Sequence, residues 1–175
     1  AREGVAVNAA DGKAIWKFAP SGGAPAGARF RHRGVTVHKD RVFVSYRSFL
    51  YALDRKTGTP IPSFGNGGRI DLREGLGMPA EKLSVSASTP GVVFEDLLIM
   101  GSSVPETIPG SPGHIRAFDV NSGALRRRFH TIPQPHGFGY DTRPTDPSKL
   151  SAHPNHVAGA PGEPGPGCGV AATRA

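Results

Sequence analysis

The stretch RFRHRGVTVHKDRVFVSYRSFLYALDRKTG, residues 29–58, decides the fold because it predicts several short strands in close succession. Residues 34–46 alternate apolar and polar side chains on both sides of a turn at residues 38–40, which is typical of a hairpin of half-buried strands. Another strand ends at Asp54, and Gly58 follows four positions later. An Asp side chain accepts bonds from backbone donors just beyond it, and glycine tolerates a positive φ. This pattern therefore predicts a tight turn into the next strand.

The same turn recurs in three segments, residues 5–18, 50–64 and 115–129. In each segment an apolar strand is followed by Asn or Asp, by glycine four positions later, and finally by phenylalanine. The residues in these places are Asn8, Gly12 and Phe18, then Asp54, Gly58 and Phe64, then Asp119, Gly123 and Phe129. Residues 91–102 add another alternating hairpin, with its turn at residues 95–96. Four short strands per unit predict the blade of a β-propeller.

The expected fold class is all-β, an incomplete β-propeller of about two four-stranded blades plus part of a preceding one. Because a propeller needs more blades than this to close, we expect residues 1–150 to form a partial propeller with exposed apolar sheet faces. Residues 65–86 and 103–113 supply extra length between repeats. Residues 151–175 are rich in Gly and Pro, which predicts a disordered C-terminal tail. We expect the chain to be a fragment whose reading frame shifts after Gly159; a natural disordered tail is the alternative.

The composition limits the classes of function. With 24 Gly and 17 Pro among 175 residues, a long helical bundle is disfavoured. The net charge of +7 permits an acidic partner, but the basic residues are scattered apart from the triplets at 31–33 and 126–128, so we predict no nucleic-acid partner. Cys168 is the single cysteine, which excludes an intrachain disulfide and a thiolate metal cluster. Residues 1–16 lack the charged start and apolar core of a signal peptide.

Two runs of sequence carry a family resemblance: RGVTVHKDRVFVSYRSFLYALDRKTGTPIPSFGNGGRIDLREGLG and LLIMGSSVPETIPGSPGHIRAFDVNSG. They resemble the PQQ-dependent quinoprotein dehydrogenases, in particular the membrane-bound glucose/quinate dehydrogenase-like members, over roughly residues 5–142. The resemblance implies an eight-bladed propeller with PQQ and a Ca²⁺ ion at its axis. It also implies oxidation of a sugar, polyol or alcohol in the periplasm, with electrons passed to ubiquinone or a cytochrome.

The resemblance assigns roles to residues at the beginning of the repeat. Arg33 lies in the Arg-Gly-Val position where the family places an arginine that contacts PQQ, and a guanidinium suits a bidentate contact with one of its carboxylates. His38 falls where glucose-oxidising members carry an active-site histidine, so it is the catalytic candidate. The alternative for His38 is a simple hairpin-turn residue beside Lys39.

Further candidates follow from the second run. Ser102 and Ser103 are implied as PQQ contacts and Glu106 as a Ca²⁺ ligand, although one carboxylate does not make a calcium site. In the segment SVSASTPG a hydroxyl is expected to reach the cofactor; the resemblance does not choose between Ser86, Ser88 and Thr89, and Ser88 is carried forward as the candidate. Thr142 is a weaker candidate of the same kind.

The chain also departs from the family pattern. A Trp usually lies four residues after the turn glycine and docks one blade onto the next; Trp16 keeps this pattern, whereas Pro62 and Arg127 do not. Val157 stands where a Trp usually stacks on the cofactor. The family's catalytic Asp lies in later blades, so we predict no dehydrogenase activity for this chain alone.

Two other classes of function remain open at this point. A non-catalytic propeller could use the same repeats as a protein-binding scaffold, as in the outer-membrane assembly lipoprotein with PQQ-like repeats; it would show no cofactor dependence. A basic nucleic-acid binder would show a steep salt dependence of binding.

Overall fold

The computed structural model describes residues 3–20, 32–105, 110–133, 137 and 139–142. Within these residues the regular structure is β, apart from two short 3₁₀ turns. The strands are β1 (Gly4–Val7), β2 (Ala14–Phe18), β3 (Thr36–His38), β4 (Arg41–Tyr46), β5 (Phe49–Asp54), β6 (Arg69–Asp71), β7 (Val92–Phe94), β8 (Leu97–Met100), β9 (Ile115–Asp119) and β10 (Leu125–Phe129). The 3₁₀ turns are η1 (Ala80–Lys82) and η2 (Tyr140–Thr142).

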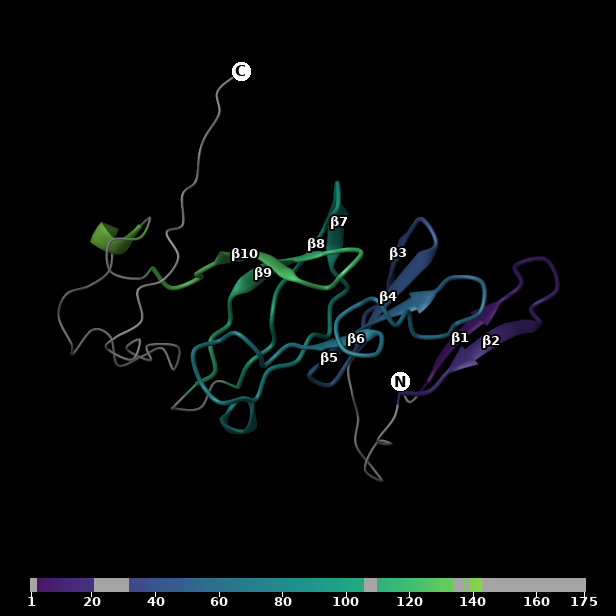
Figure 1. Ribbon diagram of the computed structural model, residues 1–175, viewed down its shortest axis with the longest axis horizontal. Coiled ribbons are helices and arrows are strands. Elements are labelled where there is room, and N and C mark those ends of the chain that lie inside the picture. The colour runs from purple at the N-terminus through teal and green to yellow at the C-terminus, as the bar shows by residue number, and fades with distance from the viewer. Residues whose placement is uncertain (1–2, 21–31, 106–109, 134–136, 138, 143–175) are drawn as a thin grey trace, which may run out of the picture.

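The strands form three antiparallel sheets, in which each strand pairs with its neighbours in sequence. The sheets are β1-β2, β3-β4-β5-β6 and β7-β8-β9-β10, and Figure 1 shows them in a row with β3–β6 in the middle. Two complete four-stranded blades and a two-stranded remnant are thus stacked face to face. This arrangement confirms the predicted all-β, incomplete propeller.

The three repeated turns are closed by the same backbone bond. The turn glycine donates its N–H to the carbonyl of the Asx residue, over 2.8 Å in the first two repeats and 2.9 Å in the third. The glycines Gly12, Gly58 and Gly123 have φ angles of 71°, 71° and 73°. This left-handed conformation is the physical reason for glycine at these positions.

The second repeat differs from the simple hairpin that the sequence predicts. Its returning chain pairs with β5 only at the bridge between Leu53 and Pro60, leaves the sheet, and pairs again as β6. Prolines at 60 and 62 lack the N–H that a continuing ladder requires. The fourth strand of this blade therefore lies within residues 65–86, which the sequence pattern predicts to be extra length between repeats.

Apolar cores lie between successive sheets. Between β1-β2 and β3–β6, Phe18 packs with Tyr46, Tyr51 and Leu53. The Trp16 indole packs over the turn glycine of the next blade, Gly58, and donates from Nε1 to the Arg55 carbonyl over 2.9 Å. The predicted docking role of Trp16 is therefore confirmed.

We call the contact between β1-β2 and β3–β6 the first joint, and the contact between β3–β6 and β7–β10 the second. The second joint uses other side chains in place of the Trp that the family pattern places there. Phe64 and Ile70 pack against Gly123, and the Gly65 N–H donates to the Ser122 carbonyl over 2.8 Å. Phe64, which is fully buried, joins the core that includes Leu98. The loop between Pro60 and β6 thus places the Phe64 ring in the second joint, at the position that Trp16 occupies in the first.

The proposed tail, residues 151–175, lies outside the described residues. Among the residues described, no helix is long and apolar enough to cross a membrane.

Candidate cofactor-binding groove

A groove of about 380 Å³ lies on the last sheet, where β8 ends and β7 begins. It brings together three of the predicted cofactor residues, Ser88, Ser102 and Ser103. The remaining lining residues are Ala87, Thr89, Pro90, Val92, Ile99, Met100, Gly101 and Ile115. The groove therefore combines hydroxyl groups with an apolar wall, a common composition for a small-molecule site.

Backbone bonds hold this groove in place across both blades. The Arg33 N–H donates to the Ser88 carbonyl over 2.9 Å, which fixes the chain entering β3 to one wall of the groove. Ser86 and Ser103 exchange two N–H···O bonds of 2.9 and 2.7 Å. The buried Ser45 hydroxyl donates to the Ala87 carbonyl over 2.8 Å. The structure thus places the backbone of Arg33, an exposed residue, next to Ser88.

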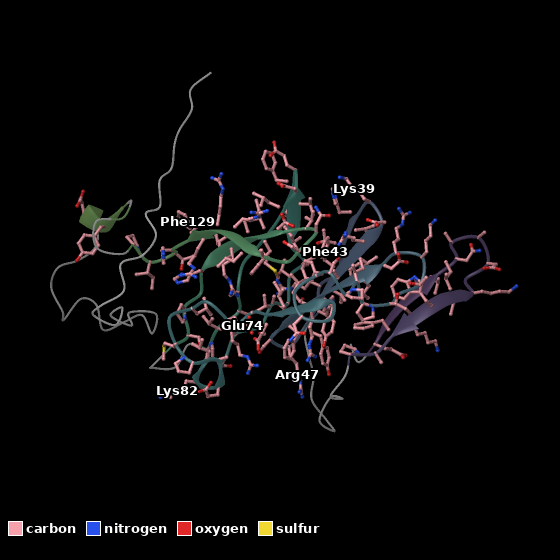
Figure 2. All side chains as sticks on the ribbon, in the orientation of Figure 1. Lys39, Phe43, Arg47, Glu74, Lys82 and Phe129 are labelled. Carbon is pink, nitrogen blue, oxygen red and sulfur yellow. The ribbon has the colours of Figure 1, made fainter. Side chains whose placement is uncertain are left out.

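His38 lies apart from this group. It is the last residue of β3, whereas Arg33 precedes the first, so the two residues lie at opposite ends of one extended segment. Figure 2 labels Lys39, which follows His38, and Arg47; the two lie at opposite ends of β4, the strand that pairs with β3. His38 lines a second, wider groove of about 640 Å³ together with Glu95 and the exposed Val37 and Val92. The structure does not bring His38 to the Arg33 and serine group.

The other two candidates cannot be placed. Glu106 lies outside the described residues, and Thr142 belongs to η2 but its side chain is not described. No cluster of three or more His, Cys, Asp or Glu side chains suited to a metal ion occurs in the described part of the chain.

Two arginines beneath the groove, Arg116 and Arg128, each donate a hydrogen bond to a backbone carbonyl, and we call this pair the clamp. No pattern in the sequence indicated it as a site. Arg116, only 2% exposed, donates to the Glu74 carbonyl and the Ser102 hydroxyl, both over 3.4 Å. Its cross-strand neighbour Arg128 donates to the Gly75 carbonyl. Neither guanidinium forms an ion pair among the described residues. Burial, and then the charge of Arg128, lower the pKa of Arg116 to about 10.

The clamp gives the groove a positive electrostatic potential. A buried charge without a carboxylate partner is poorly screened, so its field extends into the groove next to Ser102. The Nε atoms of Arg116 and Arg128 are buried and have no hydrogen-bond partner among the described residues. The alternation of side chains along β9 could have predicted that Arg116 is buried, because Arg116 lies two residues before Phe118, on the same buried face of the strand.

Two histidines pack against the clamp. The rings of His114 and His130 meet edge to face, with centroids 4.4 Å apart. Burial, and then the charges of His130, Arg128 and Arg116, lower the pKa of His114 to about 4. Burial and Arg128 likewise lower the pKa of His130. Both imidazoles are therefore neutral in the folded protein near pH 7.

This histidine pair predicts loss of stability in acid. Because the pKa of His114 is lower in the folded chain than its ordinary 6.5, the unfolded chain binds more protons between pH 6.5 and 4. Stability should be fully present above pH 6.5 and fall by about 1–2 kcal/mol toward pH 4, allowing for partial exposure of the ring. Urea titrations at several pH values measure this slope. It should flatten in His114→Gln, and an unchanged slope in that variant would contradict the assignment.

The groove fits one part of what PQQ requires. PQQ is a flat tricarboxylate, and three serine hydroxyls and the positive potential from Arg116 suit its carboxylate and carbonyl oxygens. Arg33 is not part of the groove lining but is tied to it by its backbone bond to Ser88. The described lining contains no aromatic ring on which the cofactor could stack. The chain thus supplies one polar wall of such a site.

Comparison with known proteins identifies the family of the chain. The family model for PQQ, described as "Glucose/ethanol/alcohol dehydrogenase, beta-propeller domain", matches residues 1–156. The chain therefore belongs to the PQQ-dependent dehydrogenase propeller family, as its sequence predicts.

Individual relatives are dehydrogenases. Quinohemoprotein alcohol dehydrogenase ADH IIB of Pseudomonas putida is 33% identical over 135 residues, which cover 74% of this chain and 17% of that protein. Quinate/shikimate dehydrogenase (quinone) of Acinetobacter baylyi is 31% identical over 84 residues, which cover 46% and 10%.

Solved structures show the same fold. The crystal structure of quinohemoprotein alcohol dehydrogenase from Comamonas testosteroni matches 75% of this chain and 18% of that chain, with a TM-score of 0.57 and 22% identity. Quinohemoprotein alcohol dehydrogenase ADHIIG from Pseudomonas putida HK5 matches 74% and 18%, with a TM-score of 0.57 and 27% identity. The chain thus spans less than a fifth of the length of these relatives.

Proposed function

We propose that this chain forms one wall of the PQQ site in a dehydrogenase that oxidises a small alcohol, polyol or sugar. The observation that carries the proposal is the bond from the Arg33 N–H to the Ser88 carbonyl, which joins the predicted carboxylate-binding arginine to the serine-lined groove. The named relatives, which are alcohol and quinate/shikimate dehydrogenases, support a small hydroxyl-bearing substrate.

Each residue of the wall has a binding role. The Arg33 guanidinium would pair with a PQQ carboxylate, and Ser88 and Ser103 would donate hydroxyl hydrogen bonds at the rim. Ser102 is oriented from below by Arg116, whose charge favours an anionic ligand. When bound, PQQ supplies a quinone that accepts two electrons from the carbon bearing the substrate hydroxyl.

The remaining features of the reaction are also part of the proposal. A Ca²⁺ ion would take Glu106 among several oxygen ligands. His38 stays a candidate for substrate orientation from a separate groove. Ubiquinone or a cytochrome as electron acceptor, and a periplasmic location of the enzyme, rest on the family resemblance. We predict that this chain alone does not turn over substrate.

Equilibrium dialysis of the 175-residue chain against PQQ tests the proposed wall. Saturable binding is expected in the wild type, and Arg33→Ala should weaken it about 30-fold, because a charged hydrogen-bonded contact contributes about 1.5–3 kcal/mol. Arg33→Lys should keep the charge and lose only the bidentate geometry, with an intermediate effect.

A matched control removes an exposed arginine at another turn of the same sheet. Arg55→Ala should leave PQQ affinity unchanged, because the Arg55 guanidinium reaches the Lys39 carbonyl, at the edge opposite Arg33. Equal weakening in Arg33→Ala and Arg55→Ala would indicate non-specific attraction of an anion to a basic chain. If the wild type shows no saturable PQQ binding, the proposed PQQ-binding wall is wrong, and a non-catalytic propeller that binds other proteins is favoured.

A further inference from the structure

The face of β9 and β10 that packs on the middle sheet carries four basic side chains, which we call the basic cluster: His114, Arg116, Arg128 and His130. Arg116 and Arg128 are cross-strand partners, so both project from one face of the sheet. Phe118, two residues after Arg116, lies on that face and in the core between the two blades. Ile115, which lines the groove, points to the opposite face. The basic cluster therefore lies within the second joint.

Unpartnered nitrogen atoms are concentrated in the basic cluster. The Nε atoms of both arginines and the Nδ1 atoms of both histidines are buried and have no hydrogen-bond partner among the described residues. Only two other side-chain nitrogen atoms, those of His32 and His38, share this property in the described part of the chain. Buried polar groups are normally paired, and a concentration of unpaired groups indicates a bound water or ion.

Charge decides between water and an ion in the basic cluster. Arg116 is 2% exposed, and neither Arg116 nor Arg128 forms an ion pair with a described carboxylate. The carboxylate of Asp71 acts on Arg116 from β6, but it is itself paired with Arg73 over 2.6 Å. The Phe118 ring, whose centroid lies 5.3 Å from the guanidinium carbon of Arg116, offsets part of the cost of burial. Water satisfies donors without neutralising charge, whereas an anion does both.

We propose that the basic cluster binds one small oxyanion of the sulfate or phosphate class within the second joint. The several oxygen atoms of such an anion can accept hydrogen bonds from both Nε groups at once, which favours an oxyanion over chloride. The two arginines already donate to the carbonyls of Glu74 and Gly75, in the loop that follows β6. The bound anion therefore joins β9 and β10 to the middle blade through both guanidiniums, and it acts as a structural ligand of the joint.

The two histidines should make anion binding stronger in acid. Burial, and then the neighbouring cations, lower the pKa of His114 to about 4 and lower the pKa of His130. A bound dianion opposes both causes and raises these pKa values, so the complex takes up protons that the free chain does not. Sulfate keeps its charge over this range, and its affinity should therefore rise about tenfold between pH 7 and pH 5.

The other charged groups that face the histidines do not titrate in this range. Arg116 and Arg128 stay protonated near pH 5 to 7. Burial raises the pKa of the Asp71 carboxyl, but its bonds to Arg73 hold that pKa below its ordinary value. The pH dependence of sulfate binding therefore reports on the histidine pair.

Isothermal titration calorimetry of the 175-residue chain with sodium sulfate tests the proposal, with the ionic strength held constant by sodium chloride. One sulfate per chain is expected at pH 7, with a Kd of about 1 mM or tighter. Arg128→Gln should weaken binding at least about tenfold, because it removes a charged donor. Arg128 is partly exposed, so this variant disturbs the joint less than a change at the buried Arg116. Circular dichroism checks that each variant is folded.

A neighbouring arginine supplies the matched control. Arg127 is exposed and pairs with Ala117, so its side chain lies on the other face of β10. Arg127→Gln removes the same charge and should leave sulfate affinity unchanged. His114→Gln should flatten the rise in affinity between pH 7 and pH 5, which a general attraction of anions to a basic chain does not predict.

Four outcomes would overturn the proposal. They are a wild type without saturable sulfate binding, equal weakening in Arg127→Gln and Arg128→Gln, equal sulfate affinity at pH 5 and pH 7, and a loss in Arg33→Ala as large as that in Arg128→Gln. The last outcome would place the anion in the groove on the opposite face. None of these measurements uses PQQ, so they are independent of the proposed function.

Discussion

Gly58→Ala is expected to lower the free energy of unfolding by about 4 kcal/mol. The φ angle of 71° places the new side chain in the left-handed region, which costs about 1–2 kcal/mol for a residue with a Cβ. The Cβ would also lie 2.5 Å from two carbons of the Trp16 indole, far inside van der Waals contact. The indole must therefore leave its position and the first hairpin must undock.

Gly12→Ala separates these two costs. Gly12 has the same φ angle but open space around its Cβ position, so alanine there should cost about 1 kcal/mol from backbone strain alone. Urea titrations of dilute protein, followed by circular dichroism, measure both variants. Similar losses at the two glycines would mean that the Trp16 contact does not hold the hairpin in solution.

Trp16→Ala is expected to cost about 3 kcal/mol, the second largest effect. The substitution removes the ring that covers Gly58 and the Nε1 hydrogen bond to the Arg55 carbonyl. Trp16→Phe keeps an aromatic ring in the joint and loses the hydrogen bond, so about 1 kcal/mol is expected for that variant. A loss under 1 kcal/mol in Trp16→Ala would show that the hairpin does not depend on this ring.

The two substitutions should be coupled, since they remove opposite sides of one contact. In the Trp16→Ala background, Gly58→Ala should cost no more than Gly12→Ala costs in the wild type, because only backbone strain remains. Trp16 is the only tryptophan of the chain, so its emission reports directly on the joint: Gly58→Ala should shift it to the red. Additive losses would place the effect of Gly58 elsewhere.

Much of the fold could be predicted from local patterns. The alternation on both sides of residues 38–40 and 95–96 predicted the hairpins β3-β4 and β7-β8, and the Asx and glycine spacing predicted the three repeated turns. These features depend on neighbours in sequence, because a turn is closed by bonds within five residues. The docking role of Trp16 followed from the family resemblance.

The details of the second blade could not be predicted in this way. β6 pairs with residues 49–51, and the intervening loop leads Phe64 into the next joint. Which aromatic ring fills a joint depends on the path of the loop through space, and the spacing of residues in the sequence does not contain that path.

The candidate site could likewise be predicted in part from the sequence, and the rest depended on the fold. The resemblance selected Arg33, Ser88, Ser102 and Ser103; the fold gathers the three serines at one groove and ties the backbone of Arg33 to Ser88. It also selected His38, which lies at the other end of β3. A five-residue separation in an extended chain is roughly 16 Å, so residues close in sequence can lie at opposite edges of a blade.

By itself the sequence determined the repeat, its turns and most of its strands, because each of these depends on short-range patterns of side-chain polarity and on glycine; the family followed from the resemblance of two longer runs. The tertiary structure alone decided the clamp of Arg116 and Arg128 on the carbonyls of Glu74 and Gly75, and the packing of Phe64 on Gly123. The physical reason is that burial and electrostatic environment are set by whichever surfaces the stacked sheets bring into contact, and those surfaces come from residues far apart in the chain.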